Sequence, residues 1–244
     1  MRTELVRVDD LAASQGEAMI TLFQRFFENV SREQFHKDLD EKGWAILIED
    51  DRGELRGFTT LDIYDVEHEG RTVGVVHSGD TIVDDAARGS TALSSTWIGA
   101  VNHLRRELGK DRLWWLLMVS GFRTYRFLPV FWKKFSPSCE AATPRDVRAL
   151  IDALAEERRG DRYDRKTGIV RRAEPQVLRK ELRGIPERRM RDPHVAFFAK
   201  KNPGHEKGDE LVCLTELAHH NLTDAGRRMW HAGERMFAPQ ATRW

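Results

Sequence analysis

The sequence predicts a single α/β (α+β) domain, built on a mixed, mostly antiparallel sheet with flanking helices and a helical insertion toward the C-terminus. Three observations carry this prediction. Strand-like segments at 44–51, 56–70 and 75–85 follow one another across tight connections, as in an antiparallel meander. Residues 89–108 repeat apolar side chains at helical spacing. Residues 112–120 are apolar without alternation, which is typical of a central strand covered on both faces.

The composition indicates a globular protein in a reducing compartment. A chain of 244 residues with 40% hydrophobic content can bury a substantial core, and its formal net charge of +1 provides no field for nucleic acid or anionic lipid. The two cysteines, Cys139 and Cys213, are far apart in the sequence, and we interpret both as buried thiols. The longest apolar run, 113–119, is too short to cross a bilayer, and the N-terminus lacks a signal-peptide segment. We therefore expect a cytoplasmic protein that binds neither nucleic acid nor membrane.

Two helices are predicted before the first strand. Residues 11–30 place aromatic and aliphatic side chains at helical spacing. Ser31 and Gln34 then form a capping box, which predicts a second helix through about Lys42. Two consecutive helices therefore open the predicted fold.

The last part of the chain is predicted to be mainly helical. Gly121 leads into a helix that bends or ends near Pro129, and Thr143 and Pro144 begin another helix that reaches about Arg159. Further segments are a charged loop at 160–192, a short helix at 192–204, a strand at 210–217 and a polar helix at 223–236. The single domain, 1–244, thus has a core of 1–137 plus 210–217, and an insertion of about 138–209.

The strand at 75–85 contains an unusual polar run in its middle, from His77 to Thr81. A buried polar group without a partner costs a few kcal/mol, so this run needs hydrogen-bonding partners or a wet cleft beside it. Gly79 is typical of a β-bulge, where the ladder is interrupted and backbone groups become free for another partner. The amides of Ile82 and Val83 are predicted to be such groups.

The order of these elements resembles the GNAT superfamily of acyl-CoA-dependent N-acyltransferases. The resemblance covers residues 1–137 in order, with 210–217 as a later strand of the same sheet. It implies a GNAT-like sheet with a bulged fourth strand, whose exposed amides hold the pantetheine arm of an acyl-CoA. It also implies that the N-terminus of the following helix binds the pyrophosphate of this co-substrate.

The donor site implied by the resemblance consists of two groups of residues. The first is Ile82 and Val83 on the strand. The second is the turn before the helix, with Arg88, Gly89, Ser90 and Thr91. This turn departs from the superfamily pattern at its first position, Ala86, and at its last, Thr91. The departure leaves open whether the donor is acetyl-CoA, another acyl-CoA or the arm of an acyl carrier protein.

Three residues are candidates for catalysis. The segment SGFRTYRF (120–127) follows the fifth strand, and the resemblance assigns Tyr125 as the proton donor to the departing thiolate. Asp80 and His77 are candidate bases for the amine of the acceptor. Strand alternation places these two side chains on opposite faces unless the bulge at Gly79 redirects one of them.

Three residues are candidates for binding the acceptor: Ser78, Asp80 and Glu28. Glu28 ends the first helix, which the superfamily places over the acceptor cleft. Asp80 is equally suited to tie down the amides of the bulge. The nine histidines show no ligand spacing, so no metal is expected.

The sequence as a whole predicts an N-acyltransferase that transfers an acyl group from an acyl-CoA to a small-molecule amine. Two alternatives stay open: a GNAT-fold binding module without catalysis, and a biosynthetic enzyme of the same fold that uses an acyl carrier protein. A homodimer is compatible with either.

Overall fold

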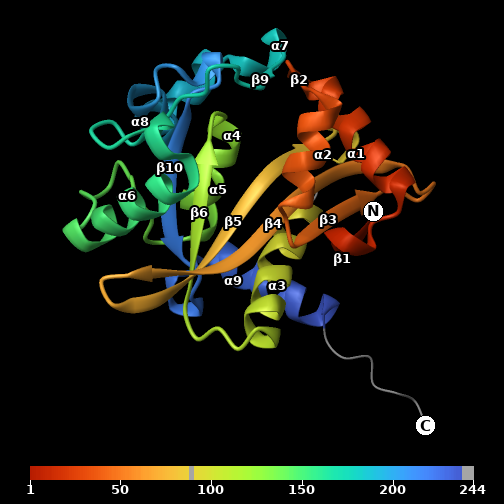
Figure 1. Cartoon of the computed structure of the whole chain (residues 1–244), viewed down its shortest axis with the longest axis horizontal. Helices are drawn as coiled ribbons and strands as arrows, with labels where there is room; N and C mark the ends of the chain where they lie inside the picture. Colours follow the sequence, from red (N-terminus) through yellow and green to blue (C-terminus); the bar gives the residue numbers. More distant parts are fainter. Residues whose placement is uncertain (88–90, 238–244) are drawn as a thin grey trace.

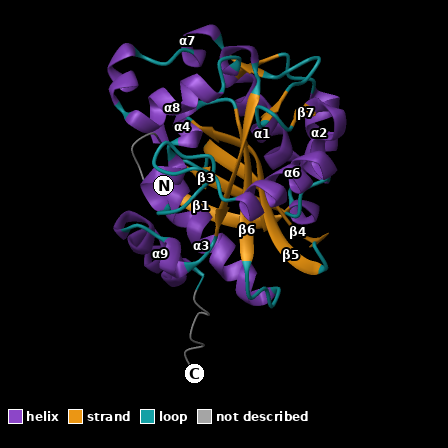
Figure 2. Cartoon of the chain, turned by 90° about the vertical axis from the view of Figure 1, so that its left-hand side faces the viewer, coloured by secondary structure: helices purple, strands orange, loops and turns teal. Residues whose placement is uncertain are grey.

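The computed structural model describes residues 1–87 and 91–237, which form one mixed sheet with helices on both sides (Figures 1 and 2). The sheet has the order β1-β3-β4-β5-β6-β10-β8-β7. Every neighbouring pair is antiparallel except β5 and β6. The predicted fold class is therefore confirmed. In sheet order the strands are β1 (Arg2–Arg7), β3 (Trp44–Glu49), β4 (Leu55–His68), β5 (Arg71–Val83), β6 (Leu113–Val119), β10 (Glu210–Glu216), β8 (Ile169–Val170) and β7 (Tyr163–Asp164).

The chain opens with a strand rather than with two helices. β1 pairs along its whole length with β3 and forms one edge of the sheet. The expectation that helices open the fold is wrong, because this short segment gains its strand structure from pairing with β3. The helices α1 (Ala13–Phe26) and α2 (Arg32–Asp40) follow, and Ser31 caps α2 as predicted by accepting a hydrogen bond from the amide of Gln34 at 3.3 Å.

One face of the sheet carries α1, α2 and α6 (Arg145–Arg159). The first two helices pack over Ala45, Leu47 and Phe58 of β3 and β4, whereas α6 packs over β6 and β10. Figure 2 shows these helices on one side of the sheet, with α3, α4, α8 and α9 on the other. Because α1 and α2 cover one half of this face and α6 covers the other, the middle strands β5 and β6 lie between two helical walls.

The opposite face is covered mainly by α3 (Ala92–Glu107) and α9 (Asp224–Met236), which pack against each other and against β6. The two helices cross at Gly99 and Gly233, where a Cβ atom on Gly99 would lie 2.3 Å from the Cα atom of Gly233. This contact sets the position of α3. Three shorter helices complete this layer: α4 (Phe122–Tyr125), α5 (Phe127–Phe131) and α8 (Pro193–Lys201).

The insertion at 138–209 contains more than helices. The segment that we predicted to be a charged loop forms β7 and β8, which extend the sheet beyond β10, and β9 (Val177–Leu178), which is followed by α7 (Lys180–Arg183). β9 pairs with β2 (Phe27–Glu28), directly after α1. The insertion is thereby joined to the first helix.

The two cysteines have different environments. Cys213 is buried as predicted, whereas Cys139 is exposed at the start of the insertion. The Sγ atom of Cys139 lies 3.2 Å from Nδ1 of His194 in α8.

Candidate functional site

A β-bulge interrupts β5 at the polar run. Thr59 of β4 pairs with Thr81, and Leu61 pairs with Ser78, so Thr60 alone stands opposite Gly79 and its neighbour in β5. A Cβ atom on Gly79 would lie 2.4 Å from Oγ1 of Thr60, so any other residue there would force the Thr60 side chain to move. The bulge predicted at Gly79 is confirmed.

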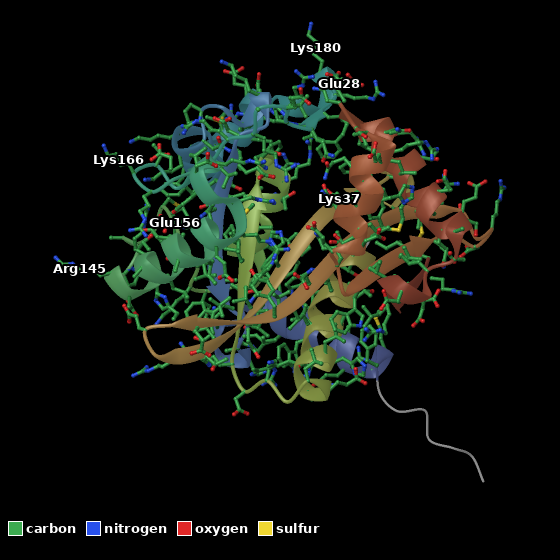
Figure 3. All side chains as sticks on the ribbon, viewed as in Figure 1. Glu28, Lys37, Arg145, Glu156, Lys166 and Lys180 are labelled. Atoms are coloured by element: carbon green, nitrogen blue, oxygen red, sulfur yellow. The ribbon has the colours of Figure 1, made fainter. Side chains whose placement is uncertain are left out.

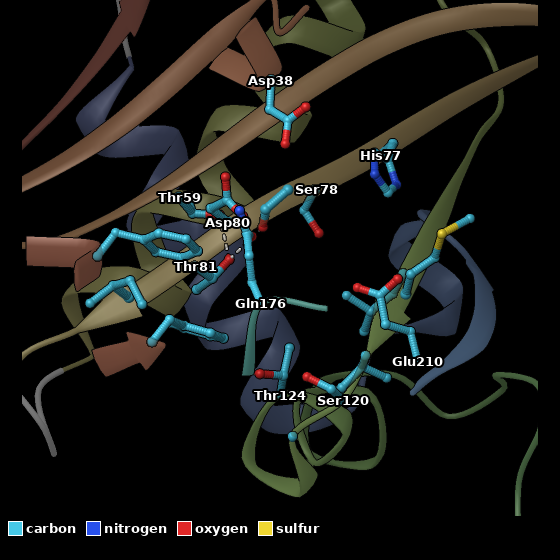
Figure 4. Close-up of a pocket in the computed structure, with 18 of the residues that line it drawn as sticks. Asp38, Thr59, His77, Ser78, Asp80, Thr81, Ser120, Thr124, Gln176 and Glu210 are labelled. Atoms are coloured by element: carbon cyan, nitrogen blue, oxygen red, sulfur yellow. Dashed lines mark hydrogen bonds between the residues drawn. The ribbon is translucent and has the colours of Figure 1, made fainter. Parts of the chain in front are cut away.

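β5 and β6 diverge close to this bulge. Their parallel pairing joins only Gly74–His77 to Leu113–Leu116. Beyond these residues β5 continues to Val83 and β6 to Val119 without pairing to each other. A cavity of about 830 Å³ lies at the divergence and is lined by both strands. Figure 4 shows His77 to Thr81 of β5, and Ser120 directly after β6, around it.

Two backbone amides of β5 face the diverging strand. The amide of Asp84 donates to the carbonyl oxygen of Arg56 at 2.7 Å. Since successive amides of a strand point to alternate sides, that of Ile82 also faces β4, and those of Thr81 and Val83 face the side from which β6 has moved away. The geometry therefore favours Thr81 and Val83, rather than Ile82 and Val83, as the free donors.

The cavity draws its lining from both faces of the sheet. On the face of α3, the lining is mostly apolar and includes Leu93, Trp97, Trp115 and Leu117. On the opposite face it is charged, and many of the ionisable residues there come from the end of α2 and the residues just after it, from β5, from the insertion including α6, and from the start of β10. They include Asp38, Glu41, Lys42, His77, Asp80, Glu157, Arg158, Arg159, Arg172 and Glu210. The cavity thus joins an apolar side to a charged one through the gap in the sheet.

A bulge in the fourth long strand, backbone amides of that strand that β6 leaves unpaired, and a helix that follows it are the features implied by the resemblance. The fold is GNAT-like. No family model and no curated protein matches the chain.

Solved structures similar to part of this chain include proteins from three organisms. One is a protein from Enterococcus faecalis V583 titled "Probable N-Acyltransferase", with 16% identity and a TM-score of 0.41 over 55% of this chain and 33% of that chain. A Trypanosoma brucei acetyltransferase has 18% identity and a TM-score of 0.38 over 52% of this chain and 88% of its own. An Escherichia coli GNAT family N-acetyltransferase in complex with CoA has 18% identity and a TM-score of 0.37 over 52% and 68%.

Asp80 is the most strongly perturbed carboxyl group of the cavity. Burial raises its pKa to about 6, and the nearby ammonium of Lys42 limits this rise. Lys42 is itself partly desolvated, which lowers its pKa, and its amine donates to the carbonyl oxygen of Asp38 at 2.9 Å. Asp80 therefore changes its charge in the range in which a general base is useful.

His77 is a neutral imidazole at the same cavity. It is 3% exposed, and burial lowers its pKa well below the usual value, assisted by the positive charges of Arg158, Arg159 and Lys42. Its Nδ1 lies 3.2 Å from the carbonyl oxygen of Leu116. Because a carbonyl only accepts, Nδ1 carries the proton and Nε2 is left as an acceptor. The side chains of His77 and Asp80 both line this cavity. This agrees with the expectation that the bulge at Gly79 redirects one of them.

Ser78 lines the cavity but already has a partner. Its hydroxyl oxygen accepts a hydrogen bond from Nε1 of Trp115 at 2.8 Å, across the gap between β5 and β6. Ser78 therefore ties the two strands together close to the point where they diverge.

Tyr125 and Glu28 do not reach the cavity. Tyr125 is fully buried among aromatic side chains, its hydroxyl donates to the carbonyl oxygen of Pro137 at 3.0 Å, and burial strongly raises its pKa. Glu28 forms an ion pair with Arg183 and lies near α7 at the top of the view in Figure 3. The structure thus offers no path from either residue to a group bound in the gap.

The predicted donor turn is only partly described. Arg88, Gly89 and Ser90 lie outside the described residues. Thr91 precedes α3, and its carbonyl oxygen accepts the amide of Ser95 at 2.8 Å. Leu93, in the first turn of α3, lines the cavity, so the start of this helix faces the gap.

Much of the charged lining of the cavity was missed from the sequence, including Asp38, Lys42, Arg158, Arg159, Arg172 and Glu210. Those on α2 and α6 have the spacing of ordinary solvated helix residues, so no local signal distinguishes them. Among the described residues, no cluster of three or more His, Cys, Asp or Glu is arranged to hold a metal ion. Over the same ranges, no helix has the length and apolar character needed to cross a membrane.

Proposed function

We propose that the protein is an acyl-CoA-dependent N-acyltransferase that acylates the amine of a small molecule. The observation that carries this proposal is the cavity between β5 and β6, which has free backbone amides on one wall and a titratable carboxyl, Asp80, at the bulge. A slender chain with amide groups, such as pantetheine, fits a gap of this kind because it continues the hydrogen bonding that β6 no longer provides.

The apolar side of the cavity is suited to the donor. The amides of Thr81 and Val83 would pair with carbonyl groups of the pantetheine arm, and Leu93 and Trp97 would pack beside it. The start of α3 would place its free N–H groups and the positive end of its dipole near the pyrophosphate. The thioester carbonyl would then lie next to the bulge.

Asp80 would act as the general base in the proposed reaction. When ionised, it would accept the proton of the acceptor's ammonium group, and the free amine would attack the thioester carbonyl. A C–N bond forms and the C–S bond breaks, and the second proton that the nitrogen loses passes through water to the departing thiolate. His77, neutral and with Nε2 available, would accept a hydrogen bond from the amine or from a bridging water. Because amines attack thioesters directly, positioning supplies much of the rate.

A thermal-shift titration tests the donor assignment. Coenzyme A, acetyl-CoA and longer acyl-CoAs are each expected to raise the melting temperature, because a ligand that binds only the folded state stabilises it. At one hundred times Kd the gain is about 2.7 kcal/mol, which corresponds to roughly 5–10 °C for a chain of this size. The absence of any shift with every thioester tested, together with no thiol release in the presence of amines, would contradict the proposal.

Replacement of Val83 by proline tests the role of the backbone. The substitution removes an amide that faces the gap and leaves the ladder with β4 intact, because Val83 is the last residue of β5 and its amide points away from β4. We expect binding of coenzyme A to weaken at least about tenfold, from one lost hydrogen bond to a desolvated partner. Val83→Ala, which keeps the amide, is the control. Equal affinities of Val83→Pro and Val83→Ala in calorimetry would show that this amide does not hold the donor.

A further inference from the structure

Three arginines of the insertion reach the charged side of the cavity. Arg158 and Arg159 end α6, and Arg172 follows β8. Arg158 is already neutralised: its guanidinium lies 3.3 Å from Oδ2 of Asp62 and 5.2 Å from the ring centre of Tyr64. The other two arginines have no such carboxylate partner among the described residues.

Among the described residues, neither Arg159 nor Arg172 forms an ion pair with a carboxylate. The Nε atom of Arg159 donates to the sulfur of Met118 at 3.2 Å, which is a weak acceptor, and burial lowers the pKa of this guanidinium. The Nε atom of Arg172 is buried without a hydrogen-bond partner. Leaving a charged donor buried and unpaired costs free energy, so this pair is suited to an anion supplied from outside.

Glu210 limits how much negative charge this corner accepts. It begins β10, lines the same cavity and has one buried carboxylate oxygen, Oε2, without a hydrogen-bond partner in the described ranges. Two guanidiniums and one carboxylate leave a net charge of +1, which matches a single carboxylate better than a doubly charged phosphate. In Figure 4, Glu210 lies across the cavity from Asp38, with His77 beside the same space.

The other end of the charged side is suited to a cation. Asp38, Glu41 and Asp80 meet there with the ammonium of Lys42. The charges that act on Asp80 include those of Asp38 and Lys42 and also those of Arg172 and Glu210. Asp80 thus belongs to the acidic end and is within electrostatic reach of Arg172, as binding of a molecule with an amine and a carboxylate would require.

We propose that the acceptor is a small amine that also bears a carboxylate, an amino-acid-type compound. Its amine lies at Asp80, and its carboxylate is held by Arg159 and Arg172. This inference rests on the acyltransferase function proposed above, and it makes the insertion the source of acceptor specificity. Since the carboxylate takes no part in the reaction, the arginine pair acts by binding and positioning.

The test compares matched acceptors and matched variants of the full-length protein. Amino acids of increasing chain length are titrated alone by calorimetry and then assayed with acetyl-CoA. Each is paired with the amine that lacks its carboxylate and with the aminophosphonate of the same length. The variants are Arg172→Gln and Arg172→Lys, with Arg162→Gln, an exposed arginine of the same insertion that does not line the cavity, as control.

The expected result is that at least one amino acid binds, and that Arg172→Gln weakens its binding ten- to a hundredfold, as for loss of a charge-assisted hydrogen bond. This variant lowers turnover of the amino acid more than turnover of the matched amine without a carboxylate, and Arg172→Lys recovers part of the affinity for the amino acid. Arg162→Gln behaves as the wild type. Folding of each variant is checked by its melting temperature; Arg172→Gln removes no hydrogen bond or ion pair found among the described residues.

Failure of this inference is distinguishable from failure of the acyltransferase function. If thioesters bind and amines are acylated with no preference for a carboxylate and no effect of Arg172→Gln, the amino-acid acceptor is excluded while the acyltransferase stands. Preference for the aminophosphonate would also overturn it in favour of a phosphate-type anion. If no thioester binds, calorimetry of the amino acids alone still decides whether Arg159 and Arg172 hold a carboxylate.

Discussion

Replacement of Asp80 by asparagine is expected to abolish most of the acyl transfer and, at the same time, to stabilise the fold at neutral pH. Asparagine keeps the shape and hydrogen-bonding capacity of the side chain but cannot accept the proton of the amine. Loss of a general base typically costs about 10²- to 10⁴-fold in rate. The wild-type kcat/KM is expected to fall as the pH drops through about 6, because Asp80 must be ionised to act.

The gain in stability follows from the same half-buried carboxyl. Its pKa in the folded protein, about 6, lies above its ordinary value of 3.8. Between these pH values the folded chain holds a proton that the unfolded chain has lost, so the free energy of unfolding falls as the pH rises through this range. Above it the penalty is about 3 kcal/mol, from a shift of about two pH units at roughly 1.4 kcal/mol each. The neutral amide of the Asp80→Asn variant would not carry this penalty.

Urea unfolding at pH 4.5 and pH 8, together with thiol-release kinetics, measures both effects. The stability difference between Asp80→Asn and the wild type should be small at the lower pH and large at the higher one. Asp161→Asn, at an exposed position outside the cavity, should change neither. If Asp80→Asn keeps most of the activity, Asp80 is not the base. If the stability difference between this variant and the wild type does not change with pH, the folded protein does not destabilise the ionised form of Asp80.

Replacement of Gly99 by alanine is expected to cause a large loss of stability through a single added methyl group. The new Cβ atom would lie 2.3 Å from Cα of Gly233 and 2.9 Å from its carbonyl carbon, which are backbone atoms that a side-chain rotation cannot move. The helices α3 and α9 must separate, and overpacking of this kind costs about 3 kcal/mol. For a chain of this length, that is a fall of roughly 10 °C in Tm.

The effect should extend to the proposed donor site, because α3 begins at the cavity and would move with the displaced crossing. The same substitution in α1, Gly16→Ala, is the control. There the nearest atom is Cε1 of His36 at 3.7 Å, an ordinary contact, and alanine favours the helix by up to about 1 kcal/mol. Equal melting temperatures for Gly99→Ala and the wild type would mean that α3 and α9 do not cross closely in solution.

Local sequence was sufficient to predict the strands that build the cavity. The polar run of β5 has no explanation in a covered strand, and Gly79 marks the place where the ladder breaks. The apolar residues at helical spacing in α3 predict that one face of this helix is buried. The uninterrupted apolar run of β6 predicts that this strand is covered on both faces. β1 and the strands β7, β8 and β9 were not recognised, because such short segments become strands only through partners distant in the sequence.

The charged side of the site could not be predicted for a similar reason. Asp38 and Lys42 lie one helical turn apart in sequence, and Arg158 and Arg159 end a helix, which are common positions for solvated charges. Only the divergence of β5 and β6, together with the walls of α2 and α6 beside it, turns these side chains inward. Tyr125, in contrast, was expected at the site but does not line the cavity. It lies at the predicted junction, but its four-residue helix directs the hydroxyl into the core, toward Pro137.

The central strand β6 has consequences for biosynthesis. Its edge away from β5 is covered by β10, and the whole insertion lies between these two strands in the sequence. While the ribosome synthesises the insertion, this edge of β6 is exposed in the nascent chain, because its partner strand β10 has not yet been synthesised. Such edges associate with other chains, so productive folding depends on the timely arrival of Glu210–Glu216. Truncations that end before this segment should therefore aggregate rather than yield a smaller active enzyme.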